Sequence, residues 1–377
     1  MKKILLIIVS LFLLLQLSCV SKNEENVTFN KEIYMPEYSS GFKIVGNNEN
    51  DDIKIISLNP WQGAENISSD FLISQNKDLI KNPNIQGIKG KAERIVCMSS
   101  THIAMLDALN ATDKIVGVSG KQYISNPYVH DHADEIADVG YEGNIDYEKL
   151  ISTKPDLVLL YAVNGASTME PKLKELGIPF MYVGDYLEEN PLGKAEWLVA
   201  IAEIIGERDL GIQKFNEISK RYQALKETVD QAELPKPAVM LNAPFSDAWF
   251  MPSTKSYVAR LIQDAGGEYI YKRNTGNSAL PIDLEAALML VSKSDFWLNM
   301  GTIQSLEELE NLVPRFMKAD CVKNGNLYNN NFRTTSGGGN DCYESGIVNP
   351  DIVLRDLIKI FHPSLIDEDL YYYHRLE

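Results

Sequence analysis

The sequence predicts an α/β protein with two similar lobes, joined by a single long α-helix and preceded by a β-rich extension. From residue 94 onward, short apolar runs alternate with helical patterns, which is typical of parallel sheets covered on both faces. The segment Ile145–Glu148 (IDYE) returns 137 residues later as Ile282–Glu285 (IDLE), so both halves carry a similar unit. Between the halves, apolar residues recur every three to five positions over residues 208–231, as on one face of a helix. Such a helix spans about 36 Å, enough to connect two lobes.

The first 18 residues have the features of a secretory signal. Lys2 and Lys3 precede an apolar run over residues 4–15, shorter than the roughly 20 residues that a membrane-spanning helix needs. Cys19 follows directly and resembles the lipidated cysteine of bacterial lipoproteins. We therefore expect a lipid anchor at Cys19 on the periplasmic side of the cell envelope, with a free cysteine on an exported protein as the alternative. Residues 19–30 are polar and acidic, and we interpret them as a tether.

The composition limits the class of partner. The 377-residue chain has a formal net charge of −16, which argues against binding to nucleic acid or anionic lipid and suits a basic partner surface. Its hydrophobic content of 45% supports a substantial core, and we expect a monomer.

The elements follow in order along the chain. Residues 31–93 contain short alternating runs at 42–45 and 53–56, which predict a β-rich extension. Residues 94–190 form the first lobe, with strands predicted at 95–98, 114–118, 156–161 and 180–183. Helices are predicted between them at 101–109, 146–152 and 170–176, the first capped by Ser99 or Ser100.

The second half repeats this alternation. Residues 191–234 predict the interlobe helices, and residues 235–361 the second lobe, with strands at 238–243 and 295–300 and helices at 256–264 and 283–291. Asn349, Pro350 and Asp351 are favourable residues for starting the last helix, which ends near Phe361. Residues 362–377 are interpreted as a tail.

The cysteines indicate an exported protein without a structural zinc site. Cys97 lies in an apolar run and is expected to be a buried strand residue. Cys321 and Cys342 are candidates for a disulfide in an oxidising compartment. No CxxC or His–Cys spacing is present.

Several segments together resemble a known family. The stretch Arg94–Val118, the motif Lys154–Val158, the turn Gly177–Pro179 and the stretch Trp249–Gly267 are similar to the siderophore-, haem- and cobalamin-type substrate-binding proteins of ABC importers. The resemblance covers roughly residues 91–361. It implies two Rossmann-like lobes joined by a single long α-helix that acts as a stiff hinge. It also implies a small-molecule metal chelate or corrinoid held between the lobes, and an ABC permease as partner.

The resemblance also implies a docking role for two glutamates. In this family a Glu on each lobe contacts Arg residues of the permease, and the matching positions are Glu148 and Glu285. Each follows an Asp at a predicted helix start, where a carboxylate is favourable and exposed. A glutamate that only stabilises its own helix is the alternative.

Ligand contacts are expected at the carboxyl ends of the strands of each lobe. Aromatic rings there suit a flat macrocycle, and cations suit an anionic chelate. The selected residues are Ser99, Ser100, Thr101, His102, Gln122, Tyr123, Tyr141, Glu142, Gly143 and Tyr161 from the first lobe, and Phe245, Trp249, Lys255, Asn274 and Arg333 from the second.

Other functions have less support in the sequence. His102 could contact a bound metal or pack at a helix start, and one histidine does not make the Zn or Mn site of a bare-ion carrier. The pair His130 and His132 is interpreted as an exposed loop, so no metal site and no cofactor are predicted, although the carried ligand would contain Fe or Co. A hydrolase would need a GxSxG motif and a chelatase would need converging cysteines, so we predict no enzyme.

Overall fold

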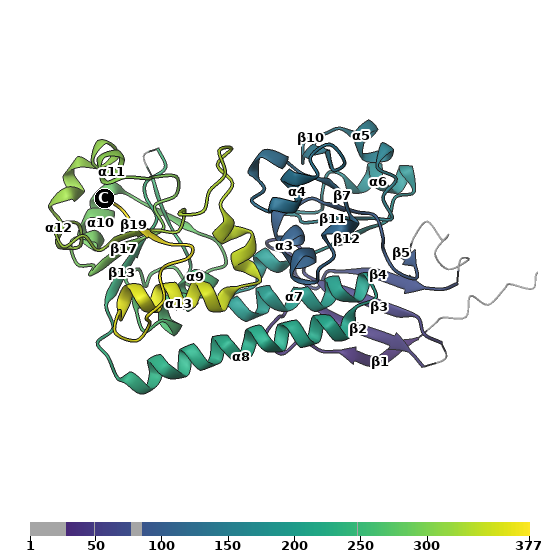
Figure 1. Ribbon diagram of the computed structural model, residues 1–377, viewed down its shortest axis with the longest axis horizontal. Coiled ribbons are helices and arrows are strands. Elements are labelled where there is room, and N and C mark those ends of the chain that lie inside the picture. The colour runs from purple at the N-terminus through teal and green to yellow at the C-terminus, as the bar shows by residue number, and fades with distance from the viewer. Residues whose placement is uncertain (1–27, 49, 77–84, 247) are drawn as a thin grey trace, which may run out of the picture.

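The computed structural model describes residues 28–48, 50–76, 85–246 and 248–377. Two α/β lobes lie side by side, and a β-rich part packs beneath the first lobe (Figure 1). The predicted fold class is therefore confirmed. The predicted signal segment, Cys19 and most of the tether lie outside the described residues. Within the described ranges, no helix has both the length and the apolar character needed to cross a bilayer.

The N-terminal extension is a five-stranded sheet in the order β1-β2-β3-β4-β5. Strands β1 to β4 form an antiparallel meander, and β5 pairs with β4 in parallel. Phe42, Ile44, Ile55 and Phe71 are buried on the face that packs against the protein. The strands are β1 (Phe29–Tyr34), β2 (Phe42–Asn47), β3 (Ile53–Leu58), β4 (Ser68–Ser74) and β5 (Gln86–Lys89).

The first lobe is built on the parallel sheet β12-β11-β6-β7-β8. Its strands are short and apolar because helices cover both faces. The strands are β6 (Ile95–Cys97), β7 (Ile115–Val118), β8 (Ala137–Asp138), β11 (Leu157–Leu160) and β12 (Phe180–Tyr182), with a hairpin of β9 (Gly140–Tyr141) and β10 (Asn144–Ile145). The helices are α3 (Ser100–Ala108), α4 (Pro127–Asp131), α5 (Tyr147–Ser152) and α6 (Glu170–Leu176), with 3-10 turns η1 (Thr112–Lys114), η2 (Lys121–Tyr123) and η3 (Asp185–Leu187).

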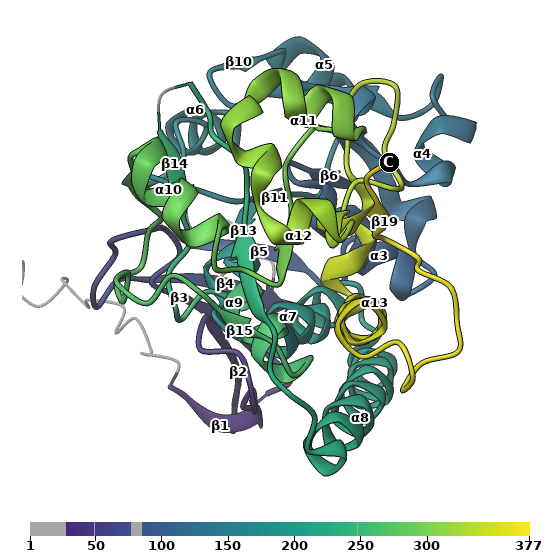
Figure 2. The same ribbon diagram turned by 90° about the vertical axis from the view of Figure 1, so that its left-hand side faces the viewer.

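Two helices connect the lobes. Helix α7 (Pro191–Ile204) is buried at all 14 positions, and α8 (Arg208–Ala232) is amphipathic, close to the predicted long helix. Gly206 has a φ of +77°, so the chain turns sharply between them. Figure 2 shows α7 between the strands of the extension and α8, while Figure 1 shows α8 running below both lobes.

The second lobe carries the sheet β15-β13-β17-β18-β19, in which only β19 is antiparallel to its neighbour. Its strands are β13 (Ala238–Leu241), β15 (Glu268–Tyr269), β17 (Phe296–Leu298), β18 (Leu327–Asn329) and β19 (His374–Arg375), beside the ribbon of β14 (Trp249–Met251) and β16 (Leu280–Ile282). The helices are α9 (Tyr257–Asp264), α10 (Leu284–Val291), α11 (Leu306–Leu312), α12 (Asp320–Lys323) and α13 (Pro350–Phe361), with 3-10 helices η4 (Pro314–Lys318), η5 (Asp341–Tyr343) and η6 (Ser345–Ile347).

The segment interpreted as a tail belongs to the second lobe. Strand β19 pairs with β18, and Tyr372 and Tyr373 are buried. The Asp356 carboxylate accepts hydrogen bonds from the backbone N–H groups of Tyr371, Tyr372 and Tyr373. This local anchoring by a residue of α13 gave no periodic signal in the sequence.

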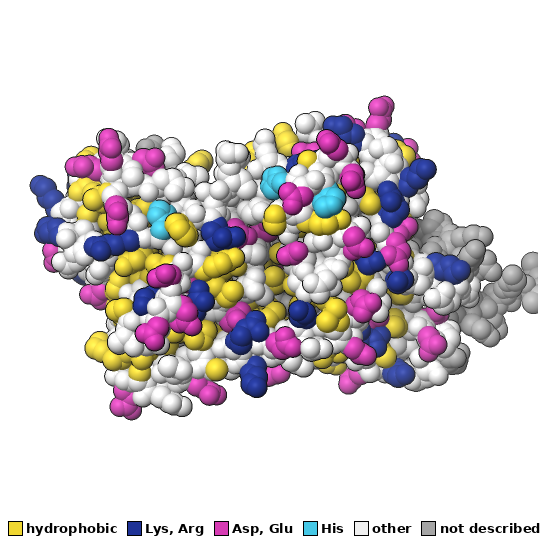
Figure 3. Space-filling model, in the orientation of Figure 1, with side chains coloured by type: hydrophobic (Ala, Val, Ile, Leu, Met, Phe, Trp, Pro, Cys, Tyr) yellow, Lys and Arg dark blue, Asp and Glu magenta, His cyan; other side chains and the backbone are white. Residues whose placement is uncertain are grey.

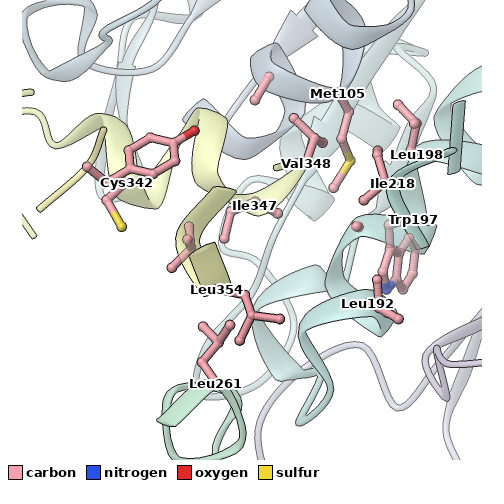
Figure 4. Packing of buried hydrophobic residues seen from close by; sticks show 14 of the residues in the cluster. Met105, Leu192, Trp197, Leu198, Ile218, Leu261, Cys342, Ile347, Val348 and Leu354 are labelled. Carbon is pink, nitrogen blue, oxygen red and sulfur yellow. The ribbon is translucent and has the colours of Figure 1, made fainter. Parts of the chain in front are cut away.

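The main hydrophobic core runs through both lobes without interruption. Figure 4 shows Met105 of α3, Trp197 of α7, Ile218 of α8 and Leu354 of α13 converging at the junction. Because interiors are close-packed, a junction of this kind resists large rigid-body motion of one lobe against the other.

Candidate functional site

A groove with a volume of about 730 Å³ lies where the extension and the two lobes meet. Figure 3 shows that the surface is also hollowed between the upper parts of the lobes. The groove is lined by Tyr38, Ser40, Gly41, Leu58, Asn59, Trp61, Gln62, Gly63 and Ala64 of the extension, by Gly184, Tyr186, Leu187, Glu188, Glu189 and Asn190 of the first lobe, and by Pro252, Ser253, Ser256, Tyr257, Gly276, Asn277, Ser278 and Ala279 of the second.

The first-lobe wall follows the carboxyl end of the edge strand β12. The Tyr186 hydroxyl donates to the carbonyl oxygen of Ala162, which fixes its ring beside Tyr161. The next residue inward, Asp185, is buried, and burial raises the pKa of its carboxyl group. Thr101 donates to one Asp185 oxygen at 3.4 Å, while the other has no hydrogen-bond partner.

Lys194 of α7 joins the two lobes behind this wall. Its ammonium group donates to the backbone oxygen of Asp185 at 2.8 Å and lies 4.7 Å from the centre of the Tyr257 ring. Burial lowers the pKa of Lys194, although Asp185 and Glu188 oppose that effect. The buried cation is therefore held by the first lobe on one side and by an aromatic ring of the second on the other.

Two buried carboxylates attach the extension to the helices. Glu196 accepts hydrogen bonds from the Tyr34 hydroxyl and from the backbone N–H groups of Glu37, Tyr38 and Ser39, all at 2.7–2.8 Å. Glu188 accepts from Ser39, Ser40, Gly41 and the Trp197 indole. Burial and the nearby Glu196 raise the pKa of Tyr34 far above its usual value. The wall formed by the extension is thus fixed to the protein.

The second-lobe wall is the start of α9 and the loop before β16. Ser256 caps α9 by accepting from the Ala259 N–H, and its hydroxyl donates to the Ser253 oxygen at 2.6 Å. Asn274 holds the loop by donating to the backbone oxygens of Met251 and Ser278. Asn274, a predicted ligand residue, is buried and does not line the groove.

Two more predicted ligand residues belong to the core. His102 is fully buried, both ring nitrogens lack a hydrogen-bond partner, and burial lowers its pKa to about 3. Trp249 is fully buried against Trp297, and its indole donates to the Leu241 oxygen. Neither side chain lines the groove.

The other predicted ligand residues of the first lobe lie near the surface. Ser99 caps α3, whereas Ser100 and Thr101 are partly exposed. Gln122, Tyr123, Tyr141 and Gly143 are exposed. The Glu142 carboxylate accepts hydrogen bonds from the Ser167 hydroxyl and the Thr168 N–H. The Tyr161 ring lies beside the Tyr186 ring.

In the second lobe, Phe245 is 78% exposed and Lys255 is exposed. Arg333 is paired with Asp341 at 2.6 Å and lies over the Tyr371 ring.

None of the 15 predicted ligand residues lines the groove, because its lining comes largely from segments beside them and from the extension. Trp61 and Gln62 precede Gly63 in the loop that follows β3. An aromatic residue and an amide in such a loop are the signal in the sequence that could have indicated the groove.

The three cysteines that the structure describes, Cys97, Cys321 and Cys342, are thiols. Cys321 and Cys342 are free and buried, so the predicted disulfide between them is not formed. Cys321 donates to the Val291 oxygen at 3.7 Å, and burial raises the pKa of Cys342 to about 12.

Among the described residues, no group of three or more His, Cys, Asp or Glu side chains is arranged to hold a metal ion. His130 and His132 instead bond to the backbone oxygens of Ile124 and Tyr128.

Glu148 and Glu285 occupy matching places in the two lobes. Each lies in the first turn of its helix, α5 or α10, behind an Asp side chain that caps the helix. Both are exposed, and Glu285 makes only a 3.5 Å ion pair with Arg315 at the surface. The repeat seen in the sequence is therefore a repeat of local geometry.

Comparisons with known proteins follow the same outline. A family model described as a periplasmic binding protein matches residues 95–333. An uncharacterized lipoprotein of Methanocaldococcus jannaschii is 25% identical, over 92% of this chain and 89% of its own length. An uncharacterized ABC transporter substrate-binding lipoprotein of Bacillus subtilis is 28% identical, over 39% of this chain and 44% of its own.

Two solved structures share the fold. A periplasmic haem-binding protein of Pseudomonas aeruginosa superimposes with a TM-score of 0.59 at 16% identity, covering 76% of this chain and 98% of its own. A protein of an ABC-type Fe³⁺-hydroxamate transport system of Saccharomonospora viridis gives 0.54 at 16% identity, over 72% and 94%.

Proposed function

Because the chain belongs to the periplasmic binding protein family, we propose that it captures a metal chelate or a corrinoid between its lobes and delivers it to an ABC permease. The family membership confirms the resemblance found in the sequence, and it makes the protein a solute-binding component of an ABC importer and not an enzyme. In agreement with its lipoprotein relatives, the protein is located on the periplasmic side of the cell envelope. Attachment of the lipid at Cys19 is part of the proposal.

The observation that carries the ligand proposal is the groove of about 730 Å³ between the lobes. Sites for small molecules typically have volumes of about 300–1,000 Å³ and combine apolar walls with a few polar groups. Here Trp61, Tyr186 and Tyr257 supply aromatic surface, while hydroxyl and amide groups surround them. A ferric siderophore, haem and cobalamin each combine a flat or compact apolar part with polar substituents, so these are the ligands we propose.

Binding is tested on the chain from Val20 onward, which contains every residue that the structure describes. Haemin, cyanocobalamin and a ferric siderophore are titrated separately, with visible absorbance of the ligand and tryptophan fluorescence as readouts. We expect at least one of them to bind at micromolar or lower concentration, because at about 1 μM the binding free energy is about −8 kcal/mol and enclosed sites reach this readily. No spectral change with any of the three would exclude the chelate and corrinoid classes.

Docking is tested by reversing two charges. The double change Glu148→Arg and Glu285→Arg is expected to reduce uptake by about tenfold or more, because each exposed carboxylate would become a cation facing a basic permease surface. Ligand binding by the purified variant should not change, since neither residue lines the groove.

The matched control reverses one exposed glutamate on each lobe at sites away from α5 and α10, Glu175→Arg and Glu268→Arg. This variant carries the same net charge as the docking variant. Equal uptake by the two double variants would remove the docking role from Glu148 and Glu285 and leave the ligand proposal untouched.

A further inference from the structure

We propose that the N-terminal extension forms one wall of the ligand site and makes the site selective for ligands without negative charge, an inference that rests on the proposed function. The end of β3 and the loop after it contribute Leu58, Asn59 and residues 61–64 to the groove, and the segment before β2 contributes Tyr38, Ser40 and Gly41. These residues precede the part of the chain that matches the family, residues 95–333.

The β3–β4 loop is held in place by the first lobe. The Gln62 N–H donates to the Val163 oxygen at 3.1 Å, and the Ser57 hydroxyl donates to the Tyr182 oxygen at 2.6 Å. The Trp61 ring meets the Tyr182 ring edge to face, with centroids 5.7 Å apart. A binding surface that is fixed before the ligand arrives loses little entropy on binding.

The segment before β2 lies directly on α7. A Cβ atom on Gly193 would lie 2.8 Å from the Tyr38 oxygen, and one on Gly41 would lie 2.9 Å from the Trp197 ring. Contact this close needs glycine on both sides. Together with the hydrogen bonds to Glu188 and Glu196, this close packing fixes the wall against α7.

The charges around the groove favour one class of ligand. Its lining residues in the described part of the chain include two carboxylates, Glu188 and Glu189, and no Lys or Arg. Lys194 lies behind Tyr257, where its ammonium group is already occupied by the Asp185 oxygen. A ligand carboxylate would thus meet like charge without a compensating cation, whereas a neutral or cationic ligand would not.

The remaining groups suit a neutral ligand with many hydrogen-bonding substituents. Asn59, Gln62 and Asn277 offer amides, Ser253 and Ser278 offer hydroxyls, and Trp61 offers a partly exposed ring. Amides both donate and accept hydrogen bonds, so they match amide or hydroxamate groups more closely than carboxylates. The chemical class is an uncharged or cationic chelate bearing amides, with a flat or apolar face.

The test combines a ligand panel with variants that fill the groove. Cyanocobalamin and ferrichrome are the neutral probes, and haemin and ferric enterobactin the anionic ones, each titrated by visible absorbance. Ala64→Trp blocks the groove from the extension and Ala279→Trp from the second lobe. Ile67→Trp is the control, because Ile67 is exposed on the same loop and does not line the groove. Thermal unfolding of each variant establishes that it is folded.

We expect a neutral probe to bind at least about tenfold more tightly than either anionic one. Its affinity should fall by about tenfold or more in both blocking variants and stay within about twofold of wild type in Ile67→Trp. Tighter binding of haemin or ferric enterobactin would overturn the charge selectivity. Binding that survives Ala64→Trp and is lost in Ala279→Trp would overturn the role of the extension alone. Failure of all four probes with the wild type would instead overturn the proposed function, and this inference with it.

Discussion

Replacing Glu196 by alanine is expected to lower the free energy of unfolding by about 4 kcal/mol. The side chain is fully buried and accepts four hydrogen bonds, three of them from backbone N–H groups. A buried donor left without a partner costs about 1–3 kcal/mol, and part of that cost is recovered if the segment moves to water. Chemical denaturation of the two proteins measures the difference.

Two further variants define the origin of this effect. Glu196→Gln keeps one acceptor oxygen and should lose about half as much stability as the alanine variant. Glu227→Ala removes an exposed carboxylate from α8 and should change the free energy of unfolding by less than about 0.5 kcal/mol. In Glu196→Ala, limited proteolysis should cut first between Tyr34 and Gly41. A loss below about 1 kcal/mol would show that the extension is not held by this carboxylate.

The second large effect is a pH dependence that originates in Glu344. This residue is buried at the contact between the lobes, where it accepts from the Ser125 N–H at 2.7 Å. Burial, with Asp341 and Asp107 nearby, raises its pKa to about 7, against about 4.5 when unfolded. The hydrogen bonds from Ser125 and Asn126 oppose the rise but do not cancel it.

The sign of the effect follows from proton binding. Between pH 4.5 and 7 the folded protein holds a proton on Glu344 that the unfolded chain has lost, so stability falls as the pH rises through this range. The full difference is about 3 kcal/mol. His102 acts in the opposite sense, because its pKa of about 3 makes stability fall as the pH drops below 6.5. The two slopes oppose each other from pH 4.5 to 6.5 in the wild type.

Glu344→Gln separates the two contributions. Glutamine has no proton to release and can still accept a hydrogen bond from the Ser125 N–H, so the variant loses the Glu344 contribution and keeps those of all other groups. We expect the stability of Glu344→Gln minus that of the wild type to rise by about 3 kcal/mol from pH 4.5 to 7.5, as measured by urea unfolding at each pH. Glu189→Gln, which removes a carboxylate at an exposed site, is the matched control. Parallel curves for Glu344→Gln and wild type would contradict the assignment.

The sequence predicted those features that are encoded locally. Each of these features depends on fewer than 30 consecutive residues. They are the cap of α3 at Ser99, the amphipathic pattern of α8, and the Asp caps at the starts of α5 and α10. Such local patterns can be recognised in a sequence without knowledge of tertiary contacts. The two-lobed fold could therefore be assembled from its parts.

The ligand residues were harder to predict because burial depends on distant segments. Trp249, Phe250 and Met251 alternate between buried and exposed, which is typical of a strand, but the pattern does not say which face meets the core. His102 follows a strand end as a ligand residue would, yet α3 packs against α7 and η6, and its side chain is buried there. The groove was missed because Trp61 and Tyr186 are 125 positions apart and meet only through the packing of the extension.

The complete burial of α7 has a consequence for the order in which the exported chain folds. Tyr34 to Gly41 leave the membrane first, but their partners Glu188 and Glu196 follow about 150 residues later. The residues of α13 that also pack on α7 follow later still. Contacts between such distant segments form late, so the first 60 or so folded positions remain open to periplasmic proteases until α7 has emerged. The autonomous folding unit thus extends beyond residues 95–333 at both ends, and a chain cut to that range would leave α7 uncovered.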